Sequence, residues 1–485
     1  MTATTAHRAR TTIRTAWRLL GVLVSTLLLV ALVTQDVSLV PLALVCGVAG
    51  VASLVSAGKM GVLSWSFGVP LFYFVFFGLL PAIQQIFGSG LRAEPEDLGR
   101  ALILASAGVA LFALLVAATP PAWSTPGRNA PPFVDSPTLR LTEPSFVFVC
   151  ILIGTGAITY SFFFGYYGFS SELQERGEFA GAASAVAGLA DIGLVAAWLH
   201  VFTRPTLRWR SVAMFSLIGV LGAALFAKSK GALILPVASM GTAYFVAKGR
   251  APLVALLCAL ALYLAVAFPF VTTWREQSST TYASRTDQVV EGLRVLREGQ
   301  WIDAALSTDA HTSLGRGVLE TFSQVVERTG TATNFEDGLT YALAVSGFVP
   351  RPLWPDKPDF RVGNYIGHKY GILGQGDDIT SIAITMMGEG YMNFGAAGIA
   401  GVMLLMGMFS ILLDCFVVPR VGRWFAAWSF SYAFLGQEGI AGGAFAGYVK
   451  TCTTAFLVLA LTSIAMSTFR IRRTPGSLGH LRSTT

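Results

Sequence analysis

Residues 348–358 read FVPRPLWPDKP, and this stretch divides the apolar sequence before it from the apolar sequence after it. Four prolines fall within nine of its residues, and proline lacks the backbone N–H that a helix or a sheet needs. The backbone is therefore either an ordered turn or a flexible linker. Phe348 and Trp354 are uncommon residue types in flexible linkers, so we expect an ordered turn that serves structure or function.

The composition indicates a multi-pass membrane protein. Hydrophobic residues make up 54% of the 485 residues and charged residues 13%, whereas soluble proteins carry roughly 25% charged residues. The net charge of +7 is spread over short loops between apolar runs, which excludes a contiguous basic domain for nucleic acid. The five cysteines all lie in apolar runs, so they indicate neither a disulfide framework nor a metal site.

A membrane-spanning helix needs about 20 mostly apolar residues. The sequence predicts twelve such helices, near residues 17–34, 37–57, 62–88, 100–118, 145–168, 180–203, 211–227, 231–247, 251–271, 396–414, 424–447 and 451–468. Loops on one side of these spans hold most of the Lys and Arg residues, which is typical of the cytoplasmic side. We expect a multi-pass protein of the cytoplasmic membrane with both termini in the cytoplasm and an uncleaved first helix.

The expected fold is all-α and has three parts. Residues 1–271 form an N-terminal bundle of about nine spans, residues 272–395 form a large extracytoplasmic loop, and residues 396–485 form the C-terminal spans and a basic cytoplasmic tail. Connections between elements usually have about 4–6 residues, so a loop of this length is expected to be functional.

Three segments of the large loop have helical patterns. Apolar residues recur at helical spacing among charged residues in residues 289–296, which predicts an amphipathic helix on the bilayer surface. A second such helix is expected over residues 314–328. The apolar run 339–349 is too short to cross a bilayer, so we expect a re-entrant or half-buried helix that places Arg351 at the mouth of a cavity.

Two cations lie in a short turn on the side where basic residues are sparse. One interpretation is that Lys228 and Lys230 extend to lipid headgroups, as long basic side chains do near helix ends. The other interpretation is an anion clamp, in which these lysines, Arg351 and Arg316 surround a phosphate or pyrophosphate.

Several ionisable residues lie in or near apolar runs. Glu389 lies between two glycines, and Asp191 and Glu438 lie inside other predicted spans. An ionised carboxylate costs roughly 2.5 kcal/mol or more in hydrocarbon, so each must face a polar cavity or a cation. For Asp191, a hydrogen bond between packed helices explains the position at least equally well. His311 and His368 in the large loop are general-base candidates near neutral pH, or are simply solvated.

The sequence contains no nucleotide-binding glycine motif, zinc-ligand spacing or nucleophile elbow in its required structural context. We expect neither a cofactor nor a metal ion. If the protein is a transferase, its donor is not a cytoplasmic nucleotide sugar.

The combination of these features resembles the O-antigen polymerase (Wzy-type) family of oligosaccharide repeat-unit polymerases. The resemblance rests on Pro350-Arg351 followed by Trp354-Pro355-Asp356-Lys357-Pro358, on the later stretch GYMNFG at residues 390–395, and on the basic turn before Gly231. The layout of spans and outer loop is similar over most of the chain, and the short motifs cover about a tenth of it. The basic turn departs from the family, because it has Lys228 and Lys230 where an arginine is common.

The resemblance implies an inverting, metal-independent glycosyltransferase at the outer face of the cytoplasmic membrane. Its donor would be a polyprenyl-pyrophosphate-linked oligosaccharide, its acceptor a second lipid-linked glycan in the same bilayer, and its partner proteins a chain-length regulator or a flippase. Fixed cations would stabilise the charge that develops on the departing pyrophosphate. The expected pyrophosphate-binding residues are Lys228, Lys230, Arg351 and Arg316.

The same chemistry needs a base for the acceptor hydroxyl and residues that hold the sugars. Arg351, Glu389 and His368 are the expected catalytic residues, with Asp378 and Glu336 as further candidates for the base. The expected sugar-binding residues are Trp354, Tyr370, Tyr391 and Asn393, with Tyr365 as a further stacking aromatic. Aromatic residues near an interface can equally belong to a membrane belt.

Three other functions remain open from the sequence. A glycan ligase of the O-antigen-ligase type needs the same clamp and topology. A flippase or other transporter of lipid-linked oligosaccharides is expected to show repeated halves with interrupted helices and short loops, and no clear internal repeat is present. In a non-catalytic assembly scaffold, the proline-rich turn would be purely structural.

Overall fold

The structure is a computed structural model that describes residues 3–34, 36–86, 95–120, 144–163, 180–226, 230–278, 285–299, 301–302, 316–346, 354, 362–376, 382–418, 428 and 445. The regular elements in these ranges are helices. They are α1 (Ala3–Thr34), α2 (Leu39–Met60), α3 (Trp65–Tyr73), the π-helix η1 (Phe74–Leu79), α4 (Leu80–Ile86), α5 (Pro95–Ala118), α7 (Pro144–Phe163), α8 (Ala180–Thr203), α9 (Leu207–Phe226), α10 (Lys230–Lys248), α11 (Leu253–Leu262), the π-helix η3 (Tyr263–Ala267), α12 (Phe268–Ser278), α13 (Arg285–Glu298), α16 (Arg316–Arg328), α17 (Leu339–Ser346), α18 (Val362–Lys369), α19 (Thr385–Leu412) and the π-helix η4 (Leu413–Val417).

The protein is a multi-pass helical membrane protein. Eight helical segments in the described ranges are apolar and long enough to cross a membrane, namely Ala16–Thr34, Leu39–Met60, Trp65–Ile86, Glu96–Ala118, Val186–Thr203, Leu207–Leu225, Val254–Trp274 and Thr385–Phe416. Two shorter apolar helices, Val147–Tyr160 and Leu233–Lys248, coincide with two more of the predicted spans. Of the last two predicted spans, 424–447 is described only at Trp428 and Phe445, and 451–468 lies outside the described residues. The predicted total of twelve is therefore not shown.

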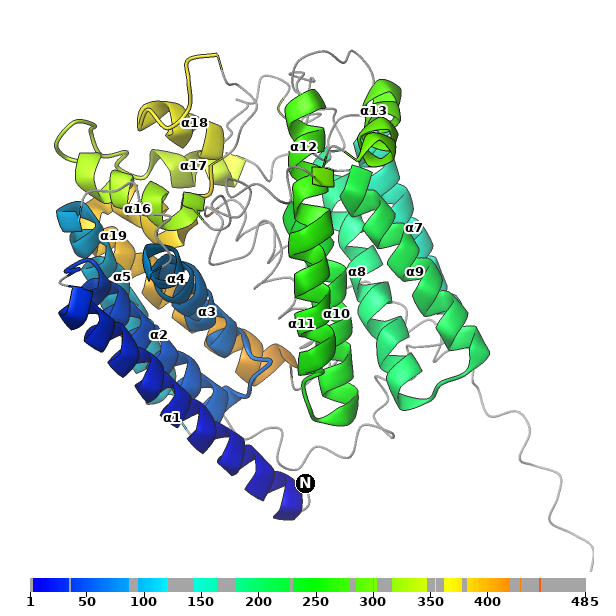
Figure 1. Cartoon of the computed structure of the whole chain (residues 1–485), viewed down its shortest axis with the longest axis horizontal. Coiled ribbons are helices and arrows are strands. Elements are labelled where there is room, and N and C mark those ends of the chain that lie inside the picture. The colour runs from blue at the N-terminus through cyan, green and yellow to red at the C-terminus, as the bar shows by residue number, and fades with distance from the viewer. Residues whose placement is uncertain are drawn as a thin grey trace, which may run out of the picture.

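The helices form two groups, which Figure 1 shows side by side. The first group contains α1 to α5 together with α16 to α19 and η4, and the largest hydrophobic core joins these early and late parts of the chain. The second group contains α7 to α12, and its apolar contacts form four smaller clusters. The chain therefore leaves the first group after α5 and returns to it at α16, which brings the large loop back onto the N-terminal helices.

Small residues allow close contact between helices of the second group. A Cβ atom on Gly154 of α7 would lie 2.2 Å from the backbone nitrogen of Ala190 in α8. A Cβ atom on Gly193 of α8 would lie 2.4 Å from the side chain of Ile151. Close approach of this kind is how glycine usually contributes to packing between membrane helices. The tight α7–α8 pair forms the centre of the second group.

The helix α19 consists of two helices joined by a sharp bend. Phe394 (φ −138°, ψ 19°) and Gly395 (φ 61°, ψ −145°) have non-helical backbone angles. Residues eight positions apart in a straight helix are separated by about 12 Å along the axis. In contrast, a Cβ atom on Gly398 would lie 1.8 Å from the carbonyl oxygen of Gly390. The short helix at residues 385–393 therefore folds back against the long helix that starts at 396, and we call residues 385–393 the re-entrant arm.

The far end of the same element is fixed by Asp414 in η4. The carboxylate accepts hydrogen bonds from the backbone N–H groups of Trp65 and Ser66, both at 2.9 Å, and from the Ser66 hydroxyl at 2.6 Å. These donors belong to the first turn of α3, where backbone N–H groups have no partner inside the helix. Asp414 thus links the end of the α19–η4 element to the start of α3.

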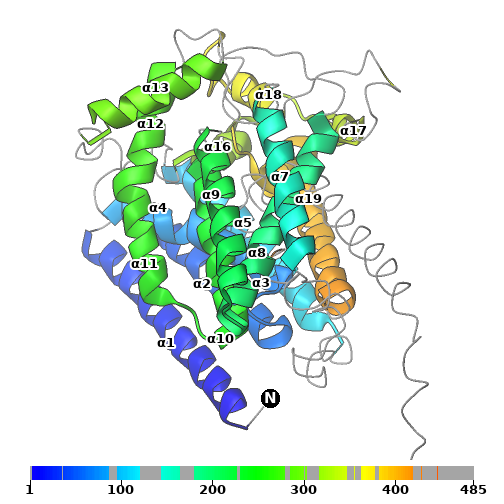
Figure 2. The same cartoon turned by 90° about the vertical axis from the view of Figure 1, so that its right-hand side faces the viewer.

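The two helices expected on the bilayer surface have different environments. Figure 2 shows α13 lying across the end of α12, and the apolar side chains Val290, Leu293 and Leu296 of α13 are exposed, as a surface helix requires. In α16, by contrast, Phe322 and Val325 are fully buried in the core that also contains α5 and α19. The expectation of a bilayer-surface helix at residues 314–328 is therefore wrong, because its apolar face packs inside the protein.

The elements of the large loop gather at one end of the molecule. In Figure 1, α13, α16, α17 and α18 lie at the end opposite to the N-terminus of α1. Within α17, Thr340 and Ala344 are buried whereas Leu339 and Ala342 are exposed, so this helix is half-buried as the sequence predicted. The candidate site lies directly beneath it.

Candidate functional site

The centre of the candidate site is Glu389, in the middle of the re-entrant arm. Every residue of the arm is buried, and the Glu389 side chain has no exposed surface. A carboxyl group reaches this position because the bend at Phe394–Gly395 turns the arm into the first group of helices. A carboxylate at this buried position needs polar contacts inside the protein.

The two carboxylate oxygens of Glu389 have different environments. Oε2 accepts a hydrogen bond from the backbone N–H of Phe445. Oε1 is buried and has no hydrogen-bond partner among the described residues, and no described cation forms an ion pair with the group. Burying a polar group without a partner costs about 1–3 kcal/mol, and more for a charged group. One oxygen of Glu389 is thus held in place, while the other has no hydrogen-bond partner within the part of the chain that the structure describes.

Asn393 fixes α17 over the arm. Its side-chain oxygen accepts a hydrogen bond from the Gly338 N–H at 2.9 Å, and its amide nitrogen donates to the Thr340 hydroxyl and to the backbone carbonyl of Glu389, both at 2.8 Å. The backbone N–H of Glu336 also donates to the carbonyl of Met392 at 3.1 Å. Asn393 is fully buried, so the structure places this predicted sugar-binding residue as a clamp between two elements. Its role toward a sugar stays a prediction.

An aromatic cluster covers the same carboxylate. The Tyr341 ring lies 5.1 Å from the Phe445 ring at an interplanar angle of 86°, and 6.1 Å from the Phe394 ring at 22°. The Tyr341 hydroxyl is buried and, among the described residues, has no hydrogen-bond partner. Burial, and after it the negative charge of Glu389, raises the pKa of Tyr341 well above its usual value. The tyrosine therefore stays protonated and can donate a hydrogen bond.

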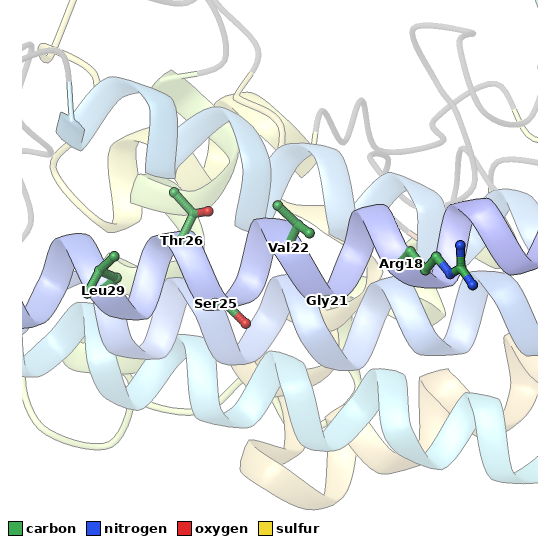
Figure 3. A pocket seen from close by; sticks show the side chains of 6 residues that line it. All are labelled: Arg18, Gly21, Val22, Ser25, Thr26 and Leu29. Atoms are coloured by element: carbon green, nitrogen blue, oxygen red, sulfur yellow. The ribbon is translucent and has the colours of Figure 1, made fainter.

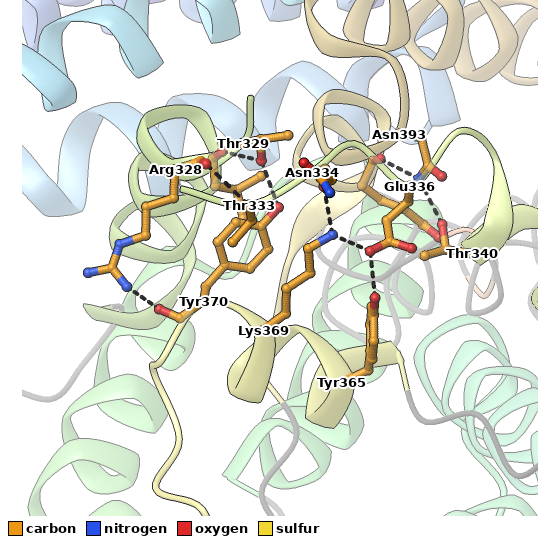
Figure 4. Close-up of polar contacts among 12 residues, drawn as sticks. Arg328, Thr329, Thr333, Asn334, Glu336, Thr340, Tyr365, Lys369, Tyr370 and Asn393 are labelled. Atoms are coloured by element: carbon orange, nitrogen blue, oxygen red, sulfur yellow. Dashed lines mark hydrogen bonds and ion pairs between the residues drawn. The ribbon is translucent and has the colours of Figure 1, made fainter. Parts of the chain in front are cut away.

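A second polar cluster ties α18 to the segment before α17, as Figure 4 shows. Lys369 forms an ion pair with Glu336 and donates to the carbonyl of Asn334 at 2.8 Å, and the Tyr365 hydroxyl also donates to Glu336. Burial and the bond to Glu336 raise the pKa of Tyr365. The charge of Glu336 is neutralised by Lys369, and the ion pair holds α18 against the segment before α17. The anchors at Asn393 and Glu336 hold both sides of the FVPRPLWPDKP stretch, most of which lies outside the described residues.

The aromatic residues expected to bind sugar are in different environments. Tyr370 is buried, its hydroxyl lies 2.7 Å from the Thr329 hydroxyl, and Arg328 donates to its carbonyl (Figure 4). Tyr391 is also buried, and its hydroxyl accepts a hydrogen bond from Arg100 at 3.1 Å. Trp354, in contrast, is 40% exposed. Of these three aromatic residues, Trp354 alone presents a ring to which a glycan has direct access.

The predicted pyrophosphate clamp cannot be traced in the structure. Arg351 and Lys228 lie outside the described residues, as do the further candidates His311, Asp378 and Glu438. Lys230 and Arg316 are the first residues of α10 and α16, and their side chains are also outside the description. The convergence of these four cations therefore stays a prediction.

Two other predicted ionisable residues lie on other helices than Glu389. His368 lies in the last turn of α18, next to the anchor residue Lys369. Asp191 is buried in α8, in the second group of helices. Glu389 is thus the one described carboxylate of the predicted set that has a buried oxygen without a partner.

A surface hollow of about 610 Å³ lies along α1 and is unrelated to this cluster. Figure 3 shows that all six residues that line it come from α1 itself, and the side chains include the apolar Val22 and Leu29 and the cation Arg18. All six are exposed. Polar groups from different elements do not converge on the hollow, which is what a binding site for a polar ligand requires.

Sequence reasoning missed four residues for which the structure shows polar or aromatic contacts, namely Thr340, Tyr341, Arg100 and Asp414. The first two fall in the apolar run 339–349, which the sequence indicates as a half-buried helix without distinguishing its faces. Arg100 and Asp414 are distant in sequence from their partners, so a pattern of local spacing carries no signal for these contacts.

The fold and these contacts define the class of the protein as a multi-pass helical membrane protein with a buried carboxylate at one end of the bundle. No protein-family model matches the chain, no curated protein matches its sequence, and no solved structure matches its fold. Function is therefore inferred from the residues themselves.

Proposed function

We propose that the protein is a membrane glycosyltransferase that polymerises polyprenyl-pyrophosphate-linked oligosaccharide repeat units at the outer face of the cytoplasmic membrane. The reaction inverts the anomeric configuration and uses no metal ion. The observation that carries the proposal is the Oε1 atom of Glu389, a buried carboxylate oxygen without a partner beneath the elements of the large loop. The resemblance of the FVPRPLWPDKP and GYMNFG stretches to the Wzy-type polymerases adds the class of substrate.

In the proposed reaction, Glu389 acts as the general base. The acceptor hydroxyl gives its proton to Oε1 while its oxygen attacks the anomeric carbon of the donor sugar. The bond from that carbon to the pyrophosphate oxygen breaks, and the electron pair leaves with the lipid pyrophosphate. A base in this position typically contributes a factor of about 10² to 10⁴ in rate. The hydrogen bond from Phe445 to Oε2 keeps the carboxylate oriented during the transfer.

The departing pyrophosphate needs cations, which Arg351, Lys228, Lys230 and Arg316 supply in this proposal. Arginine binds phosphate oxygens with two parallel N–H groups, and lysine acts as a point charge. The anchors at Asn393 and Glu336 support this assignment, because they hold in place α17 and α18, the helices that precede and follow Arg351 in the sequence.

Entry of the acceptor requires movement of α17. Glu389 has no exposed surface, and α17 is held over it by Asn393. The two residues before α17, Asp337 (φ 47°) and Gly338 (φ 92°), have left-handed backbone conformations, which form a sharp corner at the start of this short helix. In the proposed cycle, α17 turns about this corner to admit the acceptor and then closes over it, so that Tyr341 is again beside Glu389 before the transfer.

The test is reconstitution of the full-length protein in liposomes with polyprenyl-pyrophosphate-linked oligosaccharide as the sole substrate and without nucleotide. The proposal predicts a ladder of products that differ by one repeat unit. Arg351→Ala should abolish the ladder while the protein still inserts and accumulates, and Arg351→Lys should recover part of it because the charge is restored without the planar fork. A wild-type ladder from the Arg351→Ala protein would remove this residue from the mechanism.

The same assay separates the other candidate functions. A single transfer to a different acceptor, with no ladder, identifies a ligase. Movement of the lipid-linked oligosaccharide across the vesicle membrane without any new glycosidic bond identifies a transporter. Either result would replace the proposed polymerase.

A further inference from the structure

Two buried polar atoms without partners lie against the same residue. The Tyr341 hydroxyl and Oε1 of Glu389 both lack a hydrogen-bond partner among the described residues. Phe445 contacts both side chains, since its backbone N–H donates to Oε2 of Glu389 and its ring packs against the Tyr341 ring at 5.1 Å. Leaving two such groups unpaired in one place is unfavourable, which points to a ligand that satisfies them.

The position of the Tyr341 ring is well defined. Phe445 packs against it at 86°, and Phe394 lies nearly parallel to it at 6.1 Å. Thr340, the preceding residue, is bonded to Asn393 on the arm. The hydroxyl therefore cannot turn to another partner unless α17 itself moves.

The two groups are chemically complementary. Tyr341 remains protonated because burial and the charge of Glu389 raise its pKa, so it offers a donor, and an ionised carboxylate offers only acceptors. A hydroxyl group is both donor and acceptor and can bond to both at once. A phosphate is excluded from this position, because its negative charge would be repelled by Glu389.

We propose that Tyr341 and Glu389 together hold one hydroxyl group of the acceptor glycan, Tyr341 donating to its oxygen and Oε1 of Glu389 accepting its proton. This inference rests on the proposed function and deepens it, because it assigns the acceptor-binding residue of the same site. During transfer the hydroxyl proton passes to Glu389, and Tyr341 keeps its own proton. The tyrosine thus aligns the nucleophile without taking part in the proton transfer.

The test is Tyr341→Phe in the reconstituted full-length protein, with initial rates measured against acceptor concentration at saturating donor. The substitution keeps the ring and its packing and removes one hydrogen bond. We expect the KM for the acceptor to rise about tenfold, the equivalent of about 1.4 kcal/mol, with the KM for the donor unchanged. The matched control is Tyr244→Phe in α10 of the second group, which removes a hydroxyl remote from Glu389 and should leave both constants unchanged.

An acceptor that lacks the attacking hydroxyl separates binding from structure. As a competitive inhibitor, this deoxy acceptor should bind equally well to the wild type and to Tyr341→Phe, because the group that Tyr341 contacts is already absent. If the substitution weakens the intact and the deoxy acceptor by the same factor, Tyr341 acts through packing and the inference is overturned.

A second probe works even if the Tyr341→Phe protein fails to accumulate. With 3-fluorotyrosine in place of Tyr341, the fluorine resonance should shift when the intact acceptor is added, and an unchanged resonance at saturating acceptor would overturn the inference. If the wild type makes no polymer, the proposed function fails. If the wild type polymerises normally and Tyr341→Phe has the wild-type acceptor KM, the inference alone fails.

Discussion

The two ends of the α19–η4 element carry carboxylates with different hydrogen-bond partners, the fully buried Glu389 and the partly buried Asp414. Both oxygens of Asp414 accept hydrogen bonds, from Trp65 and Ser66 at the start of α3. At the other end, Glu389 has one oxygen bonded to the Phe445 N–H and one without a partner among the described residues. The carboxylate at one end therefore has hydrogen-bond donors on both oxygens, and the carboxylate at the other end has a described donor on one oxygen only.

In the proposed mechanism, this difference separates a structural carboxylate from a reactive one. A carboxylate whose two oxygens both accept hydrogen bonds from the protein has little capacity left for a ligand. Asp414 is in this state and holds two helices together. Glu389 retains an acceptor in a water-poor site, which is the arrangement expected of a general base.

The largest expected effect comes from Glu389→Gln. The amide oxygen still accepts from Phe445, but the group no longer takes a proton, so polymerisation should fall by about 10² to 10⁴. Thermal stability in detergent should stay the same or rise, because an unpaired buried carboxylate has been removed. The rate is measured by the product ladder and the stability by the melting temperature of the purified protein.

Asp414→Asn is the matched substitution at the other end and should give the reverse pattern. The new amide group faces a backbone N–H instead of accepting from it, so the free energy of unfolding should fall by about 1–3 kcal/mol while the folded protein keeps its rate per molecule. The assignment of a structural role to Asp414 would be wrong if Asp414→Asn abolishes transfer at unchanged stability. The assignment of Glu389 as the base would be wrong if Glu389→Gln retains wild-type activity.

The next prediction concerns the bend that separates the two ends. In Gly398→Ala the added Cβ would lie 1.8 Å from the Gly390 carbonyl oxygen, so the re-entrant arm cannot stay folded against the long helix. The amount of folded protein in membranes should fall several-fold, because an overpacked contact between two backbones costs about 1–3 kcal/mol or more. The yield is measured by fluorescence size-exclusion of a tagged protein.

Gly401→Ala is the control on the same helix. No atom lies within 4 Å of a Cβ at this position, so the yield should not change. Equal yields for the two variants would show that residues 385–393 do not fold back against the helix that begins at 396.

The smallest expected effect concerns a third carboxylate, Asp36, between α1 and α2. Ser38 donates to it from its N–H at 3.0 Å and from its hydroxyl at 2.5 Å, and Gln85 donates at 2.8 Å. The hydrogen bond from the Ser38 side chain is the main cause that lowers its pKa below 3.8. The group therefore stabilises the fold above this pH, and the contribution is lost as the pH falls through the lowered value. Ser38→Ala should reduce the acid sensitivity of the melting temperature, and an unchanged pH profile would count against the bonded arrangement.

The architecture could be predicted where hydrophobicity alone decides it. Ten of the predicted spans coincide with apolar helices. The pattern did not reveal that residues 385–393 are helical and buried, because an apolar run interrupted by Gly-Glu-Gly is equally compatible with a loop.

The sequence did not predict whether the apolar face of an amphipathic helix is exposed or packs inside the protein. The helices α13 and α16 have the same type of pattern, yet Leu293 is exposed and Phe322 is fully buried. Periodicity identifies the apolar face but not the surface that covers it, and for α16 that surface comes from helices about 200 residues earlier and 60 residues later in the chain.

The site was predicted in part. Glu389 stood out because a carboxylate between glycines in an apolar run demands an explanation. Tyr341 was not identified, and Asn393 was expected only to bind sugar, since their contacts depend on the fold of α17 over the arm. The roles of Tyr370 and Tyr391 were inferred from residue type, which does not distinguish an accessible ring from one whose hydroxyl is bonded inside the protein.

The most direct measurement is a cryo-EM map of the full-length protein with an acceptor glycan and a donor whose glycosidic oxygen is replaced by carbon. We expect α17 to be closed over the acceptor, with an acceptor hydroxyl within about 3 Å of the Glu389 carboxylate. A glycan bound elsewhere, with no hydroxyl near Glu389, would contradict the proposed role of this carboxylate.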